Sequence, residues 1–235
     1  MFQFKQFTIQ QDRCAMKVGT DGVLLGAWCP IDNHPFSVLD IGAGTGIIAL
    51  MLAQRTNATQ IDAIEIDKNA YEQCVENFES SPWGDRLFCF HAGLDECIEE
   101  PEDQYDIIIS NPPFYSENYK SENEQRDLAR FQEAMPFEQL VEAASLLLAE
   151  NGIFAVIIPF KEEAKFIALC AEAKLYPIKV TRVKGTPNAE IKRSMLAFKR
   201  YELPVLTADE LVIETARHQY TVAYRALTKD FYLNM

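Results

Sequence analysis

Asn111-Pro112-Pro113-Phe114 is the segment of this chain whose residue types point most directly to chemistry. The Asn111 side-chain oxygen and the Pro112 carbonyl can accept hydrogen bonds from an amine on a planar ring, and Phe114 can stack on that ring. Such an amine is a poor nucleophile because its lone pair is delocalised, and two acceptors favour a pyramidal nitrogen. Proline stiffens the carbonyl positions, so the acceptors are preorganised. The segment therefore predicts a nitrogen nucleophile on a planar group bound beside Pro113, and this chemistry needs neither a metal nor a strong base. The alternative interpretation is a plain turn at the end of a strand.

A glycine-rich loop predicts where the electrophile binds. Gly42, Gly44 and Gly46 follow an apolar run that contains Asp40, and we expect all four residues to bind the cofactor. Glycine lets the backbone turn sharply and approach a ligand closely. A nicotinamide-binding fingerprint has the spacing G-x-G-x-x-G, which would need a third glycine at residue 47, and Ile47 stands there. A purely structural turn is the other interpretation. Together with Asn111, which we expect to contact the cofactor as well, the loop predicts methyl transfer from S-adenosylmethionine.

An acidic residue follows the loop at the distance expected for a nucleoside site. Glu65 lies 19 residues after Gly46, close to the spacing at which a carboxylate accepts hydrogen bonds from ribose hydroxyls. Asp67 competes for this role, and either residue could instead cap the next helix. We assign the ribose to Glu65, the cap to Asp67 and a flank of the adenine ring to Ile66.

The order of the predicted elements places these segments on one edge of a sheet. Apolar runs predict strands, and apolar stripes predict helices between them. The strands are expected at residues 37–41, 60–66, 87–91, 105–110 and 153–158, and the helices at 45–54, 69–79, 137–148 and 161–173. The helix at 137–148 should stop at the glycine signal Asn151-Gly152. This alternation predicts a parallel sheet with helices on both faces and ligands beyond the carboxyl ends of the strands.

The alternation of strands and helices stops near the end of the chain. Residues 176–184 and 194–201 look like strands with no helix between them, which favours an antiparallel hairpin at the sheet edge. We therefore predict an α/β, Rossmann-like domain with a mostly parallel seven-stranded sheet. The whole chain, 1–235, should form one domain, in which residues 1–35 cover the ligand side of a core formed by residues 36–235.

Composition narrows the class of protein. The 48% hydrophobic content supports a packed core, and the sequence shows neither a bilayer-spanning run nor a secretory signal. The six cysteines form no C-x-x-C pair and the three histidines have no metal-ligand spacing, so we expect a cytoplasmic protein, a monomer, without metal or disulfides. The net charge of −13 argues against nucleic-acid binding, but residues 151–200 hold ten Lys or Arg and only four Glu. Such a local field can still attract phosphates, although ordinary surface charge explains it equally well.

Two further stretches identify a family. Residues 16–28 (MKVGTDGVLLGAW) and 226–233 (ALTKDFYL) resemble signature stretches of the bacterial tRNA-Val (adenine-N6)-methyltransferases, class I enzymes that methylate the adenosine beside the anticodon. The resemblance implies that Thr20 and Asp21 lie in a segment that closes over the cofactor; their residue types alone indicate a polar turn with Asp21 as a possible helix cap. Where the family usually has an Asp that contacts the cofactor adenine, this chain has Gly93. Asp95 or a backbone carbonyl is expected to replace that contact.

The resemblance also implies a surface for the anticodon stem-loop of a tRNA. Arg126 and Arg130, with Tyr115 and Tyr119, could hold a flipped nucleotide, although a solvated helix face is the equal alternative. Three cations near the late hairpin are expected to contact the anticodon arm, and four C-terminal aromatic residues are expected to pack in the core rather than stack on bases. The cations are Lys184, Lys192 and Arg193, and the aromatic residues are Tyr220, Tyr224, Phe231 and Tyr232.

Other functions compete with this interpretation. Guanine N2 of ribosomal RNA, adenine of DNA and a glutamine amide of a release factor are chemically similar targets. The glutamine-modifying relatives usually carry a separate N-terminal helical domain, for which residues 1–35 are too few, and no added DNA-reading domain is visible. A nicotinamide oxidoreductase is disfavoured by the glycine spacing, and a non-catalytic RNA-binding module by the net charge and the intact Asn-Pro-Pro-Phe segment.

Overall fold

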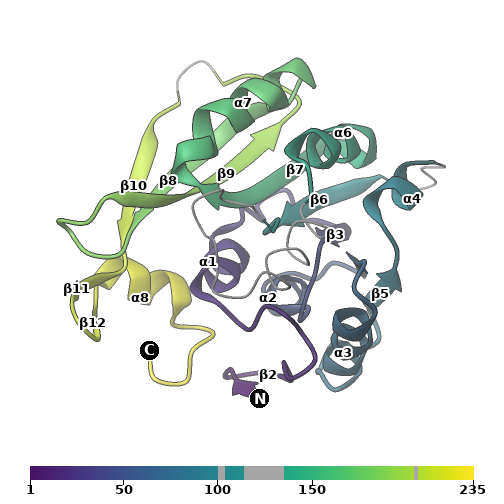
Figure 1. Ribbon diagram of the computed structural model, residues 1–235, viewed down its shortest axis with the longest axis horizontal. Helices are drawn as coiled ribbons and strands as arrows, with labels where there is room; N and C mark the ends of the chain where they lie inside the picture. Colours follow the sequence, from purple (N-terminus) through teal and green to yellow (C-terminus); the bar gives the residue numbers. More distant parts are fainter. Residues whose placement is uncertain (100–103, 114–134, 204–205) are drawn as a thin grey trace, which may run out of the picture.

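Strands buried on both faces form the centre of the fold, as their uninterrupted apolar sequences require. The computed structural model describes residues 1–99, 104–113, 135–203 and 206–235. Its main sheet has eight strands in the order β10-β8-β9-β7-β6-β3-β4-β5 (Figure 1). They are β3 (Ser37–Ile41), β4 (Gln60–Glu65), β5 (Leu87–His91), β6 (Tyr105–Ser110), β7 (Leu148–Pro159), β8 (Tyr176–Lys184), β9 (Ile191–Lys199) and β10 (Ala208–Val212).

The predicted antiparallel hairpin is confirmed. Strands β3 to β7 run parallel, β9 is antiparallel to both β7 and β8, and β10 pairs in parallel with β8. Strand β10 is an eighth strand that the sequence did not predict, because three of its five residues are exposed and two of those are charged. Since β8 runs in the same direction as β7, its carboxyl end lies at the same edge of the sheet as the glycine loop.

Helices cover both faces of this sheet, as predicted (Figure 1). Ile107 and Ile109 point into a core with one set of helices, and Ile108 points into a second core with the other set; all three are fully buried. The first set comprises α1 (Thr20–Trp28), α2 (Ile47–Arg55) and α3 (Lys68–Glu79). The second comprises α4 (Leu94–Glu99), α6 (Phe137–Leu147) and α7 (Glu163–Glu172), which follows the short helix η1 (Phe160–Glu162).

The predicted glycine stop of the 137–148 helix is wrong. Helix α6 ends at Leu147, and β7 already begins at Leu148 and runs through Asn151 and Gly152. A Cβ atom on Gly152 would lie 2.7 Å from Leu148 Cδ1 and 2.9 Å from the Tyr105 carbonyl oxygen. Gly152 is therefore required by the close approach of β6 and β7, not by a helix end.

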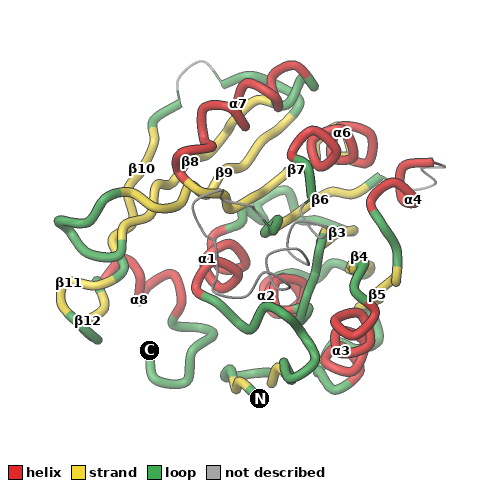
Figure 2. The backbone as a smooth tube through the Cα atoms, viewed as in Figure 1, coloured by secondary structure: helices red, strands yellow, loops and turns green. Residues whose placement is uncertain are grey.

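The two ends of the chain pack together under α1 and α2. Strands β1 (Phe2–Gln3) and β2 (Thr8–Ile9) form a small ribbon, and Lys5 N donates to the Phe231 carbonyl at 2.8 Å. Figure 2 shows that a loop without helix or strand joins β2 to α1. At the other end, β11 (Glu214–Ala216) and β12 (Gln219–Tyr220) precede α8 (Val222–Thr228).

The predicted packing of the C-terminal aromatic residues is confirmed for three of them. Tyr224 and Phe231 are buried in the core, and the Tyr232 ring lies 5.7 Å from the Phe4 ring. Tyr220 is more exposed and rests on the Tyr224 ring, with 5.2 Å between the ring centres. No helix in the described part of the chain is long and apolar enough to cross a membrane.

Candidate active site

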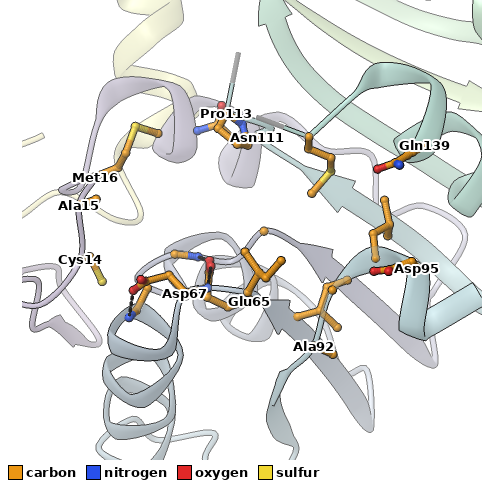
Figure 3. Close-up of a pocket in the computed structure, with 18 of the residues that line it drawn as sticks. Cys14, Ala15, Met16, Glu65, Asp67, Ala92, Asp95, Asn111, Pro113 and Gln139 are labelled. Carbon is orange, nitrogen blue, oxygen red and sulfur yellow. Dashed lines mark hydrogen bonds between the residues drawn. The ribbon is translucent and has the colours of Figure 1, made fainter. Parts of the chain in front are cut away.

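A cavity of about 270 Å³ lies beyond the carboxyl ends of β3, β4, β5 and β6 (Figure 3). Separate stretches of the chain contribute its walls, and most of the lining residues lie at or just after the end of a strand. They are the glycine loop (Gly42, Gly44), the end of β4 (Ile64, Glu65, Ile66, Asp67) with Ala70, the segment after β5 (Ala92, Gly93, Leu94, Asp95), the end of β6 (Asn111, Pro113) with the start of α6 (Met135, Pro136, Gln139), and the N-terminal loop (Cys14, Ala15, Met16). The cavity thus occupies the place where parallel sheets of this kind bind ligands.

The three glycines of the loop have different surroundings. All three have a positive φ, between 56° and 77°, which is unfavourable for other residues. Gly42 and Gly44 line the cavity, and a Cβ on Gly44 would meet no atom within 4 Å. Gly46 does not line the cavity; it caps α2, and its Cβ would lie 2.5 Å from Phe78 Cε1. Two glycines therefore border the ligand space, and the third lets α2 pack on α3.

The Glu65 carboxylate joins the glycine loop to the end of β4. One oxygen accepts from Gly44 N at 2.8 Å, and the other accepts from Asp67 N at 2.8 Å. Each oxygen keeps a lone pair for a further donor in the cavity. Asp67 accepts from Ala70 N at 2.8 Å and caps α3, as predicted. The neighbouring Ile66 side chain is 65% exposed on the cavity wall, where it offers an apolar surface to a flat ring.

Asp40 lies beneath the loop rather than in the cavity. It is fully buried, and its Oδ2 accepts from Ala49 N in α2 at 3.1 Å. Burial raises the pKa of Asp40 from 3.8 to about 7, against the Ala49 hydrogen bond and with help from the Glu65 charge. Its geometry supports the loop through α2 and gives it no contact with the cavity.

Asn111 and Pro113 face the cavity from the side opposite Glu65 and Asp67 (Figure 3). Pro112, between them, is buried and does not line the cavity. The preceding Ser110 is fully buried and donates from Oγ to the Ile41 carbonyl at 2.8 Å, which ties the end of β6 to the end of β3. The acceptor segment therefore starts from a fixed point beside the glycine loop. Phe114, Tyr115, Tyr119, Arg126 and Arg130 lie outside the described residues.

The departure at Gly93 has a direct structural counterpart. A Cβ atom on Gly93 would lie 2.5 Å from Asp95 Oδ1, so the Asp95 carboxylate fills the space that a side chain at residue 93 would need. Asp95 and Gly93 both line the cavity, while Gly93 N donates to Glu96 Oε1 at 2.8 Å at the start of α4. An acidic group is thus present at this wall, two residues later in the sequence.

Thr20 and Asp21 lie at the start of α1 and do not line the cavity. The prediction of Asp21 as a helix cap is wrong, because Gly19 is the N-cap residue and offers no side chain. Asp21 Oδ2 instead accepts from Arg193 Nε at 2.8 Å, which ties α1 to β9. The N-terminal contribution to the cavity comes from residues 14–16, which the sequence did not single out for chemistry.

The hairpin cations lie at the same edge of the sheet as the cavity. Lys184 pairs with Glu210 at 2.8 Å, Arg193 pairs with Asp21, and Lys192 is exposed. The sequence did not predict that Met135, Pro136 and Gln139, at the start of α6, line the cavity. In the sequence they look like the ordinary start of a helix. In the described ranges, no cluster of His, Cys, Asp or Glu is arranged to hold a metal ion.

Comparisons with known proteins agree with this architecture. The model of the methyltransferase small domain matches residues 29–169. The chain is 74% identical over 235 residues to a tRNA1(Val) (adenine(37)-N6)-methyltransferase of Flavobacterium johnsoniae and 69% identical over 235 residues to one of Flavobacterium psychrophilum, and both matches cover 100% of each chain. A solved structure, a predicted O-methyltransferase from Agrobacterium tumefaciens, aligns with a TM-score of 0.70 at 19% identity, over 90% of this chain and 96% of that one. This last likeness shows the Rossmann-like class I methyltransferase fold.

Proposed function

Because the chain belongs to the tRNA1(Val) (adenine(37)-N6)-methyltransferase family, we propose that it methylates N6 of an adenosine beside the anticodon of a valine tRNA, with S-adenosyl-L-methionine as methyl donor. The observation that carries this proposal is the cavity in which Glu65 and the glycine loop face Asn111 and Pro113. A nucleoside cofactor and a planar amine would meet there. We propose that the chain does this as a single-domain monomer.

The residues around the cavity fit the proposed cofactor. The open space beside Gly44 admits a ligand close to the backbone. The Glu65 oxygens, already held by two backbone N–H groups, are oriented to accept from ribose hydroxyls. Ile66 would flank the adenine. When bound, the cofactor supplies an electrophilic methyl group on a sulfonium.

Asp95 completes the proposed adenine site. Its carboxylate occupies the space beside Gly93, and a carboxylate oxygen can accept from the adenine amine. We therefore assign to Asp95 the contact that the family's usual Asp would make. The roles of Thr20, Asp21, Asp40 and Gly46 would then be indirect, because none of them lines the cavity.

Asn111 and Pro112 would orient the target amine. The Asn111 oxygen and the Pro112 carbonyl would accept hydrogen bonds from its N–H groups, so that the nitrogen lone pair points at the methyl carbon. The N–C bond would form as the S–C bond of the cofactor breaks, S-adenosylhomocysteine would leave, and the methylated nitrogen would lose one proton to solvent. Ser110 keeps this segment in register with the glycine loop through its hydrogen bond to Ile41. Such alignment can contribute on the order of 7–11 kcal/mol to lowering a barrier in favourable cases. Pro113 would border the base.

The tRNA would approach over the hairpin side of the same edge. We propose that Lys184, Lys192 and Arg193 contact the phosphates of the anticodon arm, and that Phe114, Tyr115, Arg126 and Arg130 hold the flipped nucleotide. The support is the direction of β8, whose carboxyl end shares the edge with the cavity. Anticodon-loop bases can be splayed out and stacked on aromatic side chains, as this arrangement requires.

A labelling experiment tests the reaction. The protein is incubated with isotopically labelled S-adenosylmethionine and small RNA from cells that lack it, and the RNA is digested and examined by mass spectrometry. Labelled N6-methyladenosine, mapped to a valine tRNA, is the expected result. Label in N2-methylguanosine, or only in protein, would refute the proposed target.

The variant Asn111→Ala tests the mechanism. We expect kcat to fall on the order of 100-fold or more, because a preorganised acceptor is lost. Calorimetry should give a cofactor Kd close to that of the unmodified protein, because Glu65 and the glycine loop would supply most of the cofactor contacts. Near-normal turnover in this variant would rule out the proposed role of Asn111.

A further inference from the structure

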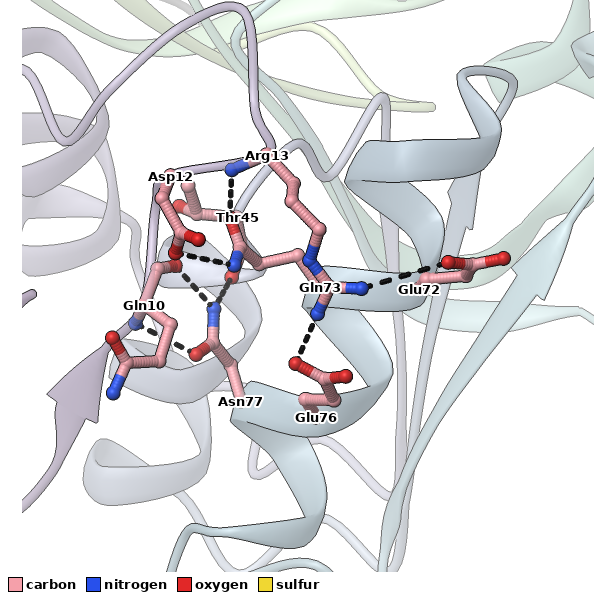
Figure 4. A network of polar contacts seen from close by, with 8 residues as sticks. All are labelled: Gln10, Asp12, Arg13, Thr45, Glu72, Gln73, Glu76 and Asn77. Atoms are coloured by element: carbon pink, nitrogen blue, oxygen red, sulfur yellow. Dashed lines mark hydrogen bonds and ion pairs between the residues drawn. The ribbon is translucent and has the colours of Figure 1, made fainter.

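Two buried amide side chains on α3 hold the N-terminal loop through hydrogen bonds of the kind that a backbone amide would make. Gln73 and Asn77 are each 1% exposed and lie one helical turn apart. Asn77 accepts from Gln10 N at 2.8 Å and donates to the Gln10 carbonyl at 2.9 Å, as a neighbouring strand would (Figure 4). Gln73 accepts from Arg13 N at 2.8 Å and donates to Asp12 Oδ1 at 3.0 Å. Buried amides with such complete pairing fix the segment that they contact.

Asn77 also contacts the glycine loop. Its Nδ2 donates to the Thr45 carbonyl at 2.9 Å, and Thr45 lies between Gly44 and Gly46. One side chain therefore connects the loop under the proposed cofactor with the segment that passes over it. Residues 14–16, which line the cavity, follow directly after Arg13.

The loop has little other regular support at this point. No helix or strand forms between β2 and α1, and the exposed pairs of Arg13 with Glu72 and Glu76 contribute little because water screens them. We call residues 10–16 the cover segment. Within it, Gln11 accepts from Val18 N at 2.8 Å and Cys14 is buried, while the backbone groups of Gln10 and Arg13 are bound to α3 by the two amides.

We propose that Gln73 and Asn77 are positioning residues that hold the cover segment closed over the cofactor and so set its rate of release. The inference rests on the proposed function, since it assumes a nucleoside cofactor in the cavity. Without the amides, the backbone groups of Gln10 and Arg13 would turn to water, and residues 14–16 would leave the cavity wall. The chemistry at Asn111 would be untouched once the cofactor is bound.

The test compares Gln73→Ala and Asn77→Ala with the control Glu76→Ala. The control removes only the exposed ion pair between Glu76, on the same helix, and Arg13. Stopped-flow measurement should show S-adenosylmethionine leaving both amide variants on the order of ten-fold faster. The KM for S-adenosylmethionine should rise to match, while kcat at saturation stays within about two-fold. Hydrogen exchange at Gln10 N and Arg13 N should accelerate. Glu76→Ala should match the unmodified protein.

Other outcomes refute the inference. Unchanged release from both amide variants, or a fall in the melting temperature of the ligand-free protein with no change in release, would show that the amides only support the fold. A fall in kcat with unchanged KM would show that they act on the reaction itself. If the unmodified protein does not bind S-adenosylmethionine, the proposed function fails instead, so the two failures are distinguishable.

Discussion

Gly46→Ala should destabilise the fold, although Gly46 belongs to the loop that borders the proposed cofactor site. Its φ of 77° costs an L-residue about 1–2 kcal/mol. The new Cβ would lie 2.5 Å from Phe78 Cε1 and 2.8 Å from Cys74 Sγ, and both side chains are buried. Overpacking of this kind costs about 1–3 kcal/mol. We therefore expect the free energy of unfolding to fall by about 2–5 kcal/mol.

Gly44→Ala is the matched comparison. Its φ of 56° carries the same backbone penalty, but its Cβ meets nothing within 4 Å, so the free energy of unfolding should fall by only about 1–2 kcal/mol. That Cβ would enter the space beside the cavity, where Gly44 N is held by Glu65. Cofactor affinity should therefore fall much more in Gly44→Ala than in folded Gly46→Ala.

Urea unfolding without ligand and calorimetric titration with S-adenosylmethionine measure the two effects separately. The reasoning is refuted for Gly46 if the variant unfolds at the same urea concentration as the unmodified protein. It is refuted for Gly44 if the variant binds the cofactor with an unchanged Kd, since the cavity would then not be the cofactor site.

Two further changes test the core of the site and of the sheet. The pKa of Asp40 is raised from 3.8 to about 7, so its stabilising contribution is complete below pH 4 and is lost between about pH 4 and 7, by up to about 4 kcal/mol. Asp40→Asn should therefore flatten the loss of stability over that pH range in urea unfolding, and an unaltered pH dependence would contradict the raised pKa of this buried carboxyl. Gly152→Ala should lower the free energy of unfolding by about 1–3 kcal/mol, because the new Cβ would contact Leu148. Thermal unfolding measures this effect, and an unchanged melting temperature would contradict the close approach of β6 and β7.

Strands with continuous apolar sequences were the most predictable part of the fold. The predicted bounds 37–41 and 105–110 are those of β3 and β6, because strands covered on both faces are mostly apolar. The prediction failed where a residue had two physical uses. Gly152 looks like a helix end in the sequence, whereas in the structure it admits the Leu148 side chain beside β6.

The residues of the candidate site also divide into those that the sequence predicted and those that it did not. Gly42, Gly44, Glu65 and Asn111 follow strands, so the strand order alone brought them to one edge, and all four line the cavity. Residues 14–16 and the start of α6 come from segments with no strand before them, and tertiary contacts place them. The amides that fix the N-terminal loop look like ordinary polar positions of a helix, since nothing in the sequence shows that Gln73 and Asn77 are buried.

The charges in the sequence indicated where the basic residues lie, but they were less informative about the strength of the positive field there. Residues 151–200 hold ten Lys or Arg, and five of these form ion pairs in the described structure. Three of the acidic partners, Asp21, Glu138 and Glu210, come from outside that range. The positive field that the hairpin edge offers to a phosphate backbone is therefore weaker than the residue count indicates, because Lys184 and Arg193 each stand beside a carboxylate. The proposed binding of tRNA at this edge should depend on direct contacts more than on long-range attraction, which agrees with the net charge of −13.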